Sequence, residues 1–202
     1  LDAVSARDVC LVASESGAPF LSIAFAAAHP ERVRALVLHM PIPVTPLTLL
    51  VDGPEALFDW GTPAFARRDL ESHIPSIAGD PSAVDAWAAY LRASASPGSA
   101  LALRRQLWET DVRDLLPSVR PPVLITIHPD GPLLDQIRPF VDDLTEGLPD
   151  ARVVALPGRD LPYWSGDRGR FTAELEEFFT GTRSLARSDD RGLATVLFTD
   201  IV

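Results

Sequence analysis

The sequence predicts an α/β protein, in which parallel strands with flanking helices are interrupted by a helical cap insertion. Three observations support this fold class. Short apolar strands alternate with helical segments near both ends of the chain, proline-punctuated segments fill the middle, and 47% of the 202 residues are apolar. Such alternation is typical of a parallel sheet with crossover connections. The length and apolar content are those of one folded domain, or of one domain and a fragment of a second.

The N-terminal part predicts strand, helix and strand in succession. Residues 8–13 (DVCLVA) are rich in Val and Leu and end at small residues, as buried parallel strands do. Residues 17–29 are rich in Ala, Leu and Phe, which favour a helix, and Pro30 ends it. Residues 34–39 (RALVLH) predict a second buried strand. Together these elements make one right-handed crossover unit.

A change of pattern between residues 41 and 120 predicts the helical cap. This region has amphipathic, proline-punctuated segments and no convincing strand. Large aromatic residues are concentrated in it: Phe58, Trp60, Phe65, Trp87, Tyr90 and Trp108. Two roles are open for the aromatic set Trp60, Trp87, Tyr90 and Trp108. It lines a pocket for an apolar small-molecule ligand under the cap, or it packs the cap onto the sheet.

The alternation of strands and helices resumes after the cap. Residues 123–127 (VLITI) and 152–156 (RVVAL) predict buried strands. A helix is predicted after each of them, at residues 134–147 and 168–179. The sequence therefore predicts at least four parallel strands with the cap inserted between the second and the third.

Charge and cysteine usage exclude several classes of partner and site. With 28 acidic and 18 basic residues the formal net charge is −10, a field that repels nucleic acid and anionic membrane surfaces. Cys10 is the single cysteine, which excludes an intrachain disulfide and any multi-cysteine metal site and fits a reducing compartment. No apolar run reaches the roughly 18 residues of a membrane span, and no signal-peptide pattern is present. We therefore expect a cytoplasmic protein with no nucleic-acid partner and no membrane span.

A serine between the first strand and the first helix is a candidate nucleophile. The segment reads Ser14-Glu15-Ser16-Gly17-Ala18. A sharp strand-to-helix turn needs small residues two positions before and after its central serine, because backbone and neighbouring side chains come close there. Ser14 and Ala18 are small, so Ser16 can occupy such a turn. The alternative is that Ser16 only caps the helix, and these residues alone leave both roles open.

Residues 9–39 (VCLVASESGAPFLSIAFAAAHPERVRALVLH) resemble the nucleophile-elbow region of the α/β-hydrolase fold. The resemblance runs from Asp8 to about Thr180. The family pattern G-x-S-x-G reads S-x-S-x-A here, which leaves Ser16 in the nucleophile slot with both glycines replaced. Several strands precede the elbow in that family. The resemblance therefore implies that the chain is the C-terminal half of the fold, with the upstream strands and one oxyanion N–H absent from it.

The same resemblance implies a triad histidine after the last strand. The chain has His29, His39, His73 and His128, and no histidine follows them. In related hydrolase domains that are fused to a cyclase, the segment after the last strand resembles G-x-D-H-L-P-W. The same place in this chain, residues 158–164, reads GRDLPYW. Leu161 thus stands at the expected histidine position, and a leucine cannot accept the serine proton.

The triad acid and a substitute base are open questions in the sequence. Asp130, in HPDGP, is the better candidate for the acid, with Asp135 as the other, although an Asp before Gly more often forms a turn. His39, which ends the second strand, and His73, in the cap, are candidates for an unusual base. Structural roles are commoner for both histidines.

The end of the chain resembles a different family. Residues 181–192 are polar and lack apolar periodicity, as a linker does. Residues 193–202 (LATVLFTDIV) are similar to the opening strand of class III adenylate/guanylate cyclase domains. That resemblance implies that Asp200 is a metal ligand, with Mg²⁺ or Mn²⁺ bound only in a complete cyclase domain. The hydrolase-like domain, residues 1–180 with the cap at about 41–120, is expected to need no cofactor.

Three functions are compatible with these features. The first is a catalytically degenerate hydrolase-like domain that senses a ligand and regulates a class III cyclase in a longer parent protein. The second is an active serine hydrolase, an esterase or lipase, with an unidentified base. The third is a structural or dimerisation module. A homo-oligomer is expected in each case, because the apolar strand 8–13 carries no Pro or Lys that would block pairing at a sheet edge.

Overall fold

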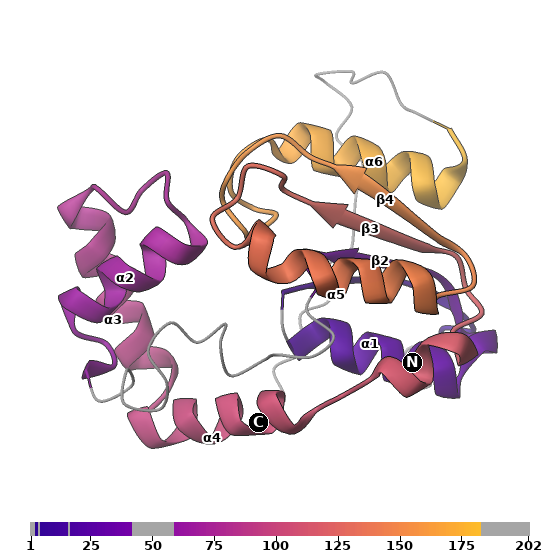
Figure 1. Ribbon diagram of the computed structural model, residues 1–202, viewed down its shortest axis with the longest axis horizontal. Helices are drawn as coiled ribbons and strands as arrows, with labels where there is room; N and C mark the ends of the chain where they lie inside the picture. Colours follow the sequence, from indigo (N-terminus) through magenta and orange to yellow (C-terminus); the bar gives the residue numbers. More distant parts are fainter. Residues whose placement is uncertain (1–2, 4, 16, 42–58, 183–202) are drawn as a thin grey trace.

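The computed structural model describes residues 3, 5–15, 17–41 and 59–182, and within these it does not describe the side chains of Trp108 and Gln136. The described part is built on a four-stranded parallel sheet in the order β1-β2-β3-β4 (Figure 1). The strands are β1 (Val9–Ser14), β2 (Val33–His39), β3 (Val123–Ile127) and β4 (Ala151–Ala155). Each of the four strands predicted for the sheet is confirmed to within one residue at each end. The strand predicted at residues 193–202 lies outside the described residues.

Helices cover the two faces of the sheet. α1 (Gly17–Ala28) and α5 (Leu134–Gly147) lie on one face, and α6 (Arg168–Thr180) lies on the other (Figure 1). Two short 3₁₀ turns that the sequence did not predict precede β2 and β3, η2 (Pro30–Arg32) and η5 (Arg113–Ser118). None of the helices in the described ranges is both long enough and apolar enough to cross a membrane.

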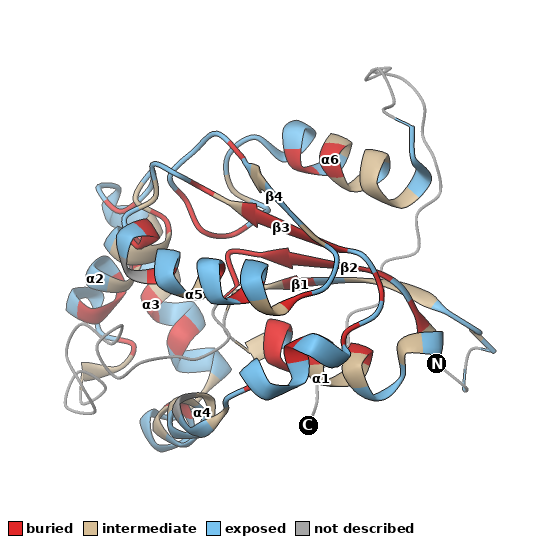
Figure 2. Cartoon of the chain, turned by 45° about the vertical axis from the view of Figure 1, so that its right-hand side comes forward, coloured by how far each residue is buried: buried red, intermediate tan, exposed pale blue. Residues whose placement is uncertain are grey.

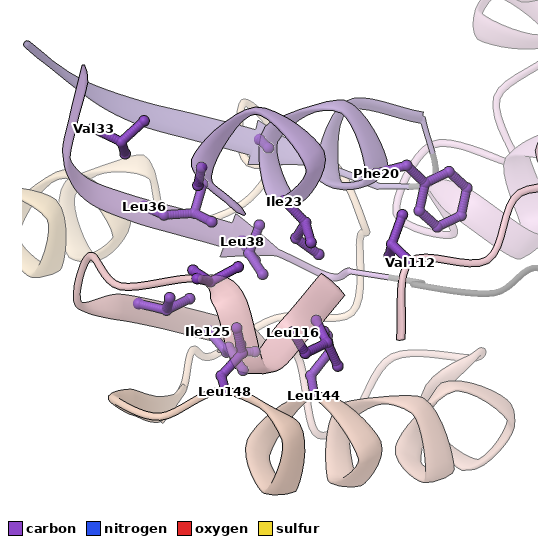
Figure 3. Packing of buried hydrophobic residues seen from close by; sticks show 14 of the residues in the cluster. Phe20, Ile23, Val33, Leu36, Leu38, Val112, Leu116, Ile125, Leu144 and Leu148 are labelled. Atoms are coloured by element: carbon purple, nitrogen blue, oxygen red, sulfur yellow. The ribbon is translucent and has the colours of Figure 1, made fainter. Parts of the chain in front are cut away.

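The central strands are the most buried part of the fold. Leu36, Val37 and Leu38 in β2 are 0% exposed, which explains why their segment is apolar without alternation (Figure 2). On the face of α1 and α5, Leu36 and Leu38 meet Ile23 and Leu144 in the main core (Figure 3). Full burial of each such side chain stabilises the fold by roughly 1.5–3 kcal/mol. The two edge strands, β1 and β4, are more exposed.

The described part of the cap between β2 and β3 contains three helices: α2 (Pro63–His73), α3 (Pro81–Ser94) and α4 (Pro97–Glu109). Each begins with proline directly after a capping residue. The side chains of Thr62, Asp80 and Ser96 accept hydrogen bonds from backbone N–H groups in the first turn. Proline has no N–H to leave unpaired there, which is why proline punctuates this region of the sequence.

The cap has a hydrophobic core of its own. Phe65, Leu70 and Leu91 are buried in it, and Trp60 and Trp87 pack against it. The indole of Trp60 donates to the carbonyls of Leu91 and Ala95, at 3.1 and 2.9 Å. Of the two roles open for the aromatic set, Trp60 and Trp87 have the packing role. They pack the cap helices against one another, however, and not against the sheet. Phe58 lies outside the described residues, and Tyr90 is 59% exposed.

Candidate functional site

The four parallel strands β1 to β4 all end at the same edge of the sheet. The register places Ser14, His39 and Thr126 side by side at this edge. The cap helices α2 and α3 lie beyond the same edge (Figure 1). A site in the described part would therefore be formed by side chains at this edge of the sheet and in the adjacent cap helices.

A strained residue directly follows the last residue of β1. Glu15 has a φ of 64°, a left-handed conformation that is uncommon for residues other than glycine. Its backbone N–H donates to the carbonyl of His39 at 2.9 Å and so extends the β1–β2 ladder by one rung. The predicted nucleophile Ser16 lies outside the described residues.

Polar groups of the cap lie near Glu15. Burial raises the pKa of Glu15, His73 acts to lower it, and Asp69 acts to raise it. In α2, His73 Nδ1 lies 2.8 Å from the carbonyl oxygen of Asp69 and 3.4 Å from its Oδ1. The Asp69 carboxylate also accepts from the indole N–H of Trp87 at 2.8 Å. Sequence reasoning named His73 but missed Glu15 and Asp69, whose significance depends on contacts between distant segments.

Leu161 is buried at the position where the resemblance implies a histidine. It is 3% exposed and packs in an apolar cluster with Met40, Leu133, Leu134 and Ile137. Its backbone is fixed on both sides. Its N–H donates to the carbonyl of His73 at 2.7 Å, and its carbonyl lies 2.7 Å from His39 Nε2. The β4–α6 loop therefore presents a packed aliphatic side chain to this region.

His39 has both ring nitrogens committed to structural hydrogen bonds. It is 0% exposed, with Nε2 on the Leu161 carbonyl and Nδ1 at 2.8 Å from the Thr126 hydroxyl. Because a carbonyl can only accept, Nε2 carries the proton and Nδ1 accepts from Thr126. Burial lowers the pKa of His39 to about 4, against the opposing effect of the bond to Leu161. A neutral imidazole held in this way has no nitrogen left to take a proton from a nucleophile.

His128 and Asp130 follow β3 but have different surroundings. His128 is 5% exposed, and its Nδ1 lies 3.3 Å from the Leu156 carbonyl, while its buried Nε2 has no hydrogen-bond partner among the described residues. Burial lowers the pKa of His128. Asp130 is exposed on a turn that the bond from Gly131 N–H to the His128 carbonyl closes at 3.1 Å. The turn-forming role considered for Asp130 is thus observed, and the exposed Asp135 lies in the first turn of α5.

Asp160 joins the β4–α6 loop to the cap, which sequence reasoning did not anticipate. It is 5% exposed and accepts from the Ser76 N–H at 3.0 Å and from the hydroxyls of Ser76 and Ser165, each at 2.5 Å. Burial acts to raise the pKa of Asp160, but the hydrogen bonds from Ser165 and Ser76 outweigh burial and lower it. We call these contacts the Asp160 latch.

A cavity of about 270 Å³ lies beside the latch. Its lining comes from the loop after α2, the end of β3 and the β4–α6 loop: Pro75, Ser76, His128, Gly158, Arg159, Asp160, Ser165 and Gly166. The volume suits a small molecule or several waters. Within the described ranges, no group of three or more His, Cys, Asp or Glu side chains is arranged to hold a metal ion. Asp200, the metal ligand implied by the cyclase resemblance, lies outside those ranges.

Known structures share the fold of this chain. MGS-M2, an α/β hydrolase from a deep-sea metagenome library, matches 94% of this chain and 70% of its own, with a TM-score of 0.67 and 18% identity. The chain has the α/β-hydrolase fold. A hydrolase from Pseudomonas aeruginosa, with 18% identity, and the enol-lactonase from Burkholderia xenovorans, with 16%, each match 89% of this chain and 68% of their own with a TM-score of 0.70.

These similarities concern the fold alone, because the sequence identities are low. No family model matches the sequence, and no curated protein matches it. The chain spans about two thirds of the length of the matched hydrolases, in agreement with the predicted partial α/β-hydrolase fold.

Proposed function

We propose that this chain is a non-hydrolytic α/β-hydrolase-like domain that binds a small ligand and regulates a class III nucleotidyl cyclase in a longer protein. The observation that carries the proposal is the burial of Leu161, at 3% exposure, where the resemblance implies the catalytic histidine. Loss of the base from a serine triad lowers turnover on the order of a million-fold. A hydrolase fold retained without a base is suited to binding rather than to turnover.

The surroundings of Leu161 support the view that leucine is a well-packed replacement for the histidine at this position. Its backbone N–H and carbonyl are bonded to His73 and His39, and its side chain packs in an apolar cluster. His39, one of the two alternative bases that the sequence offers, already uses both ring nitrogens.

The cavity beside the Asp160 latch supports ligand binding. It has polar groups from Ser76, Asp160 and Arg159 among apolar and glycine walls, a mixture that is typical of small-molecule sites. It also lies between the cap and the sheet loops, so a bound ligand would alter the contacts between them. The Asp160 latch is the structural element through which we expect occupancy to be transmitted.

The link to a cyclase rests on the sequence of residues 193–202, which are outside the described part. In a longer protein, Asp200 would be one of the ligands of Mg²⁺ or Mn²⁺ in a complete cyclase domain. We expect Asp200→Ala to abolish cyclic nucleotide production by such a protein, and Asp160→Ala, which opens the latch, to alter its rate. Unchanged production in Asp200→Ala would contradict the cyclase part of the proposal.

Hydrolysis of p-nitrophenyl butyrate tests the hydrolase-like part. We expect the wild-type chain to show no turnover above a matched Ser16→Ala variant. Turnover that Ser16→Ala abolishes would contradict the proposal. In that case a second function, a serine hydrolase using the His73–Asp69 pair near the β1–α1 turn, would be favoured. His73→Ala would then abolish the turnover as well.

A further inference from the structure

The residue in the strained position of the β1–α1 turn is Glu15. The described residues include three non-glycine residues with positive φ, namely Ser5, Glu15 and Met40. Of these, Glu15 lies within two residues of both a strand end, that of β1, and a helix start, that of α1. In the α/β-hydrolase fold the nucleophile itself sits on this sharp, strained strand-to-helix turn. The backbone conformation therefore bears on which residue occupies the nucleophile position.

We propose that Glu15, rather than Ser16, occupies the nucleophile position of this turn, an inference that rests on the proposed non-hydrolytic function. The family pattern G-x-S-x-G then reads Ala13-Ser14-Glu15-Ser16-Gly17, one residue earlier than the S-x-S-x-A register. In this register the second glycine of the pattern is retained and the first is replaced by alanine, the next smallest residue. The departure from the family is then the nucleophile itself.

The neighbours of Glu15 support this register. Ala13, two residues before, is 1% exposed in the core, where a larger side chain would require its packed neighbours to shift. Gly17, two residues after, is the first residue of α1 and is the small residue that the pattern requires there. The Glu15 N–H makes the last rung of the β1–β2 ladder, and α1 begins two residues later, at Gly17.

The side-chain environment of Glu15 agrees with this position. A side chain on this turn projects at the C-terminal edge of the sheet, toward the cap. Glu15 is under the electrostatic influence of His73 and Asp69, both from cap helix α2. The site thus presents a carboxyl group where an acyl-transfer enzyme presents a hydroxyl. Two positions, Glu15 and Leu161, then depart from the triad, and replacing Leu161 by histidine alone would not restore hydrolysis.

The comparison of glycine with alanine at position 15 tests the register. Glycine adopts positive φ without the steric cost that alanine meets. We expect Glu15→Gly to melt about 2–4 °C above Glu15→Ala. Ser14, the last residue of β1, provides the matched control, and there we expect Ser14→Gly to melt below Ser14→Ala, because glycine weakens a strand. A Glu15→Gly variant that melts at or below Glu15→Ala would overturn the inference.

A crystal structure of the wild-type chain gives a second measurement that does not depend on the variants. We expect a positive φ at Glu15, and a negative φ there with a positive φ at Ser16 would overturn the inference. Neither readout involves hydrolysis. Failure of the proposed function, seen as ester turnover, is therefore distinguishable from failure of the register, seen as a reversed stability order or a negative φ.

Discussion

Removal of the Asp160 carboxylate is expected to separate the β4–α6 loop from the cap. Asp160→Ala deletes three hydrogen bonds, one from the Ser76 N–H and two from the hydroxyls of Ser76 and Ser165. A hydrogen bond to a charged group contributes about 1.5–3 kcal/mol. The three bonds share one carboxylate, and the adjacent cavity lets water reach the freed groups. We therefore expect a total loss of about 3 kcal/mol rather than the sum of three independent bonds.

The loss can be measured as a change in melting temperature at pH 7. For a chain of this length, about 3 kcal/mol corresponds to a decrease of roughly 6–12 °C. Asp130→Ala is the matched control, because Asp130 is an exposed aspartate on a neighbouring loop, and its change should stay within about 0.5 kcal/mol. Equal melting temperatures for the two variants would refute the reasoning that the latch joins cap and loop.

The pH dependence gives the latch a second signature. The pKa of Asp160 is lowered in the folded state, so its contribution to stability is present above the unfolded value near 4 and is lost as the pH falls through the folded value. The difference between wild type and Asp160→Ala should therefore shrink below about pH 4. A difference that stays constant down to pH 2 would indicate that packing, rather than the carboxylate, accounts for the effect.

Three further predictions follow from buried or exposed side chains. Burial raises the pKa of Glu15, so the ionised carboxyl destabilises the fold. Glu15→Gln should therefore melt above wild type at pH 7, and this difference in melting temperature should vanish below about pH 4. A lower melting temperature for Glu15→Gln at pH 7 would contradict the prediction. Burial lowers the pKa of His39 to about 4, so the free energy of unfolding should fall by about 3 kcal/mol between pH 6.5 and 4. This loss should be absent in His39→Gln when unfolding is followed by circular dichroism. Equal losses in both chains would contradict the prediction. Within the described part, β1 pairs with β2 alone, and Val12 of β1 is 46% exposed. Sedimentation velocity should therefore show oligomers of the wild-type chain and smaller species of Val12→Lys. Monodisperse wild-type monomers would refute this prediction.

Local sequence patterns are sufficient for most elements of this fold. The strand at Val123–Ile127 was predicted with its observed bounds, because an apolar run between prolines and a turn has few alternatives. The cap helices follow from proline and capping residues, as at Thr62 and Asp80. The two 3₁₀ segments were missed because runs of three and six residues are too short to show a periodicity.

The site was less predictable, because its contacts join distant segments. The Asp160 latch connects residues 84 positions apart, and His39 is bonded to residues 87 and 122 positions away. No local pattern reports such contacts. The burial of Leu161 agrees with the resemblance that placed it at the histidine position, but its bonds to His39 and His73 depend on the tertiary structure. The turn at Glu15 was ambiguous because S-x-S-x-A and A-x-E-x-G overlap in the same few residues.

The central claim, that the fold is retained without an activated serine, is tested most directly by a fluorophosphonate probe. Such a probe phosphonylates a serine whose hydroxyl is activated by a base, whatever the natural substrate is. After incubation with excess probe, intact-mass spectrometry should return the unmodified mass of the chain, because Leu161 supplies no base. A stoichiometric mass increase that maps to Ser16 and disappears in Ser16→Ala would contradict the claim.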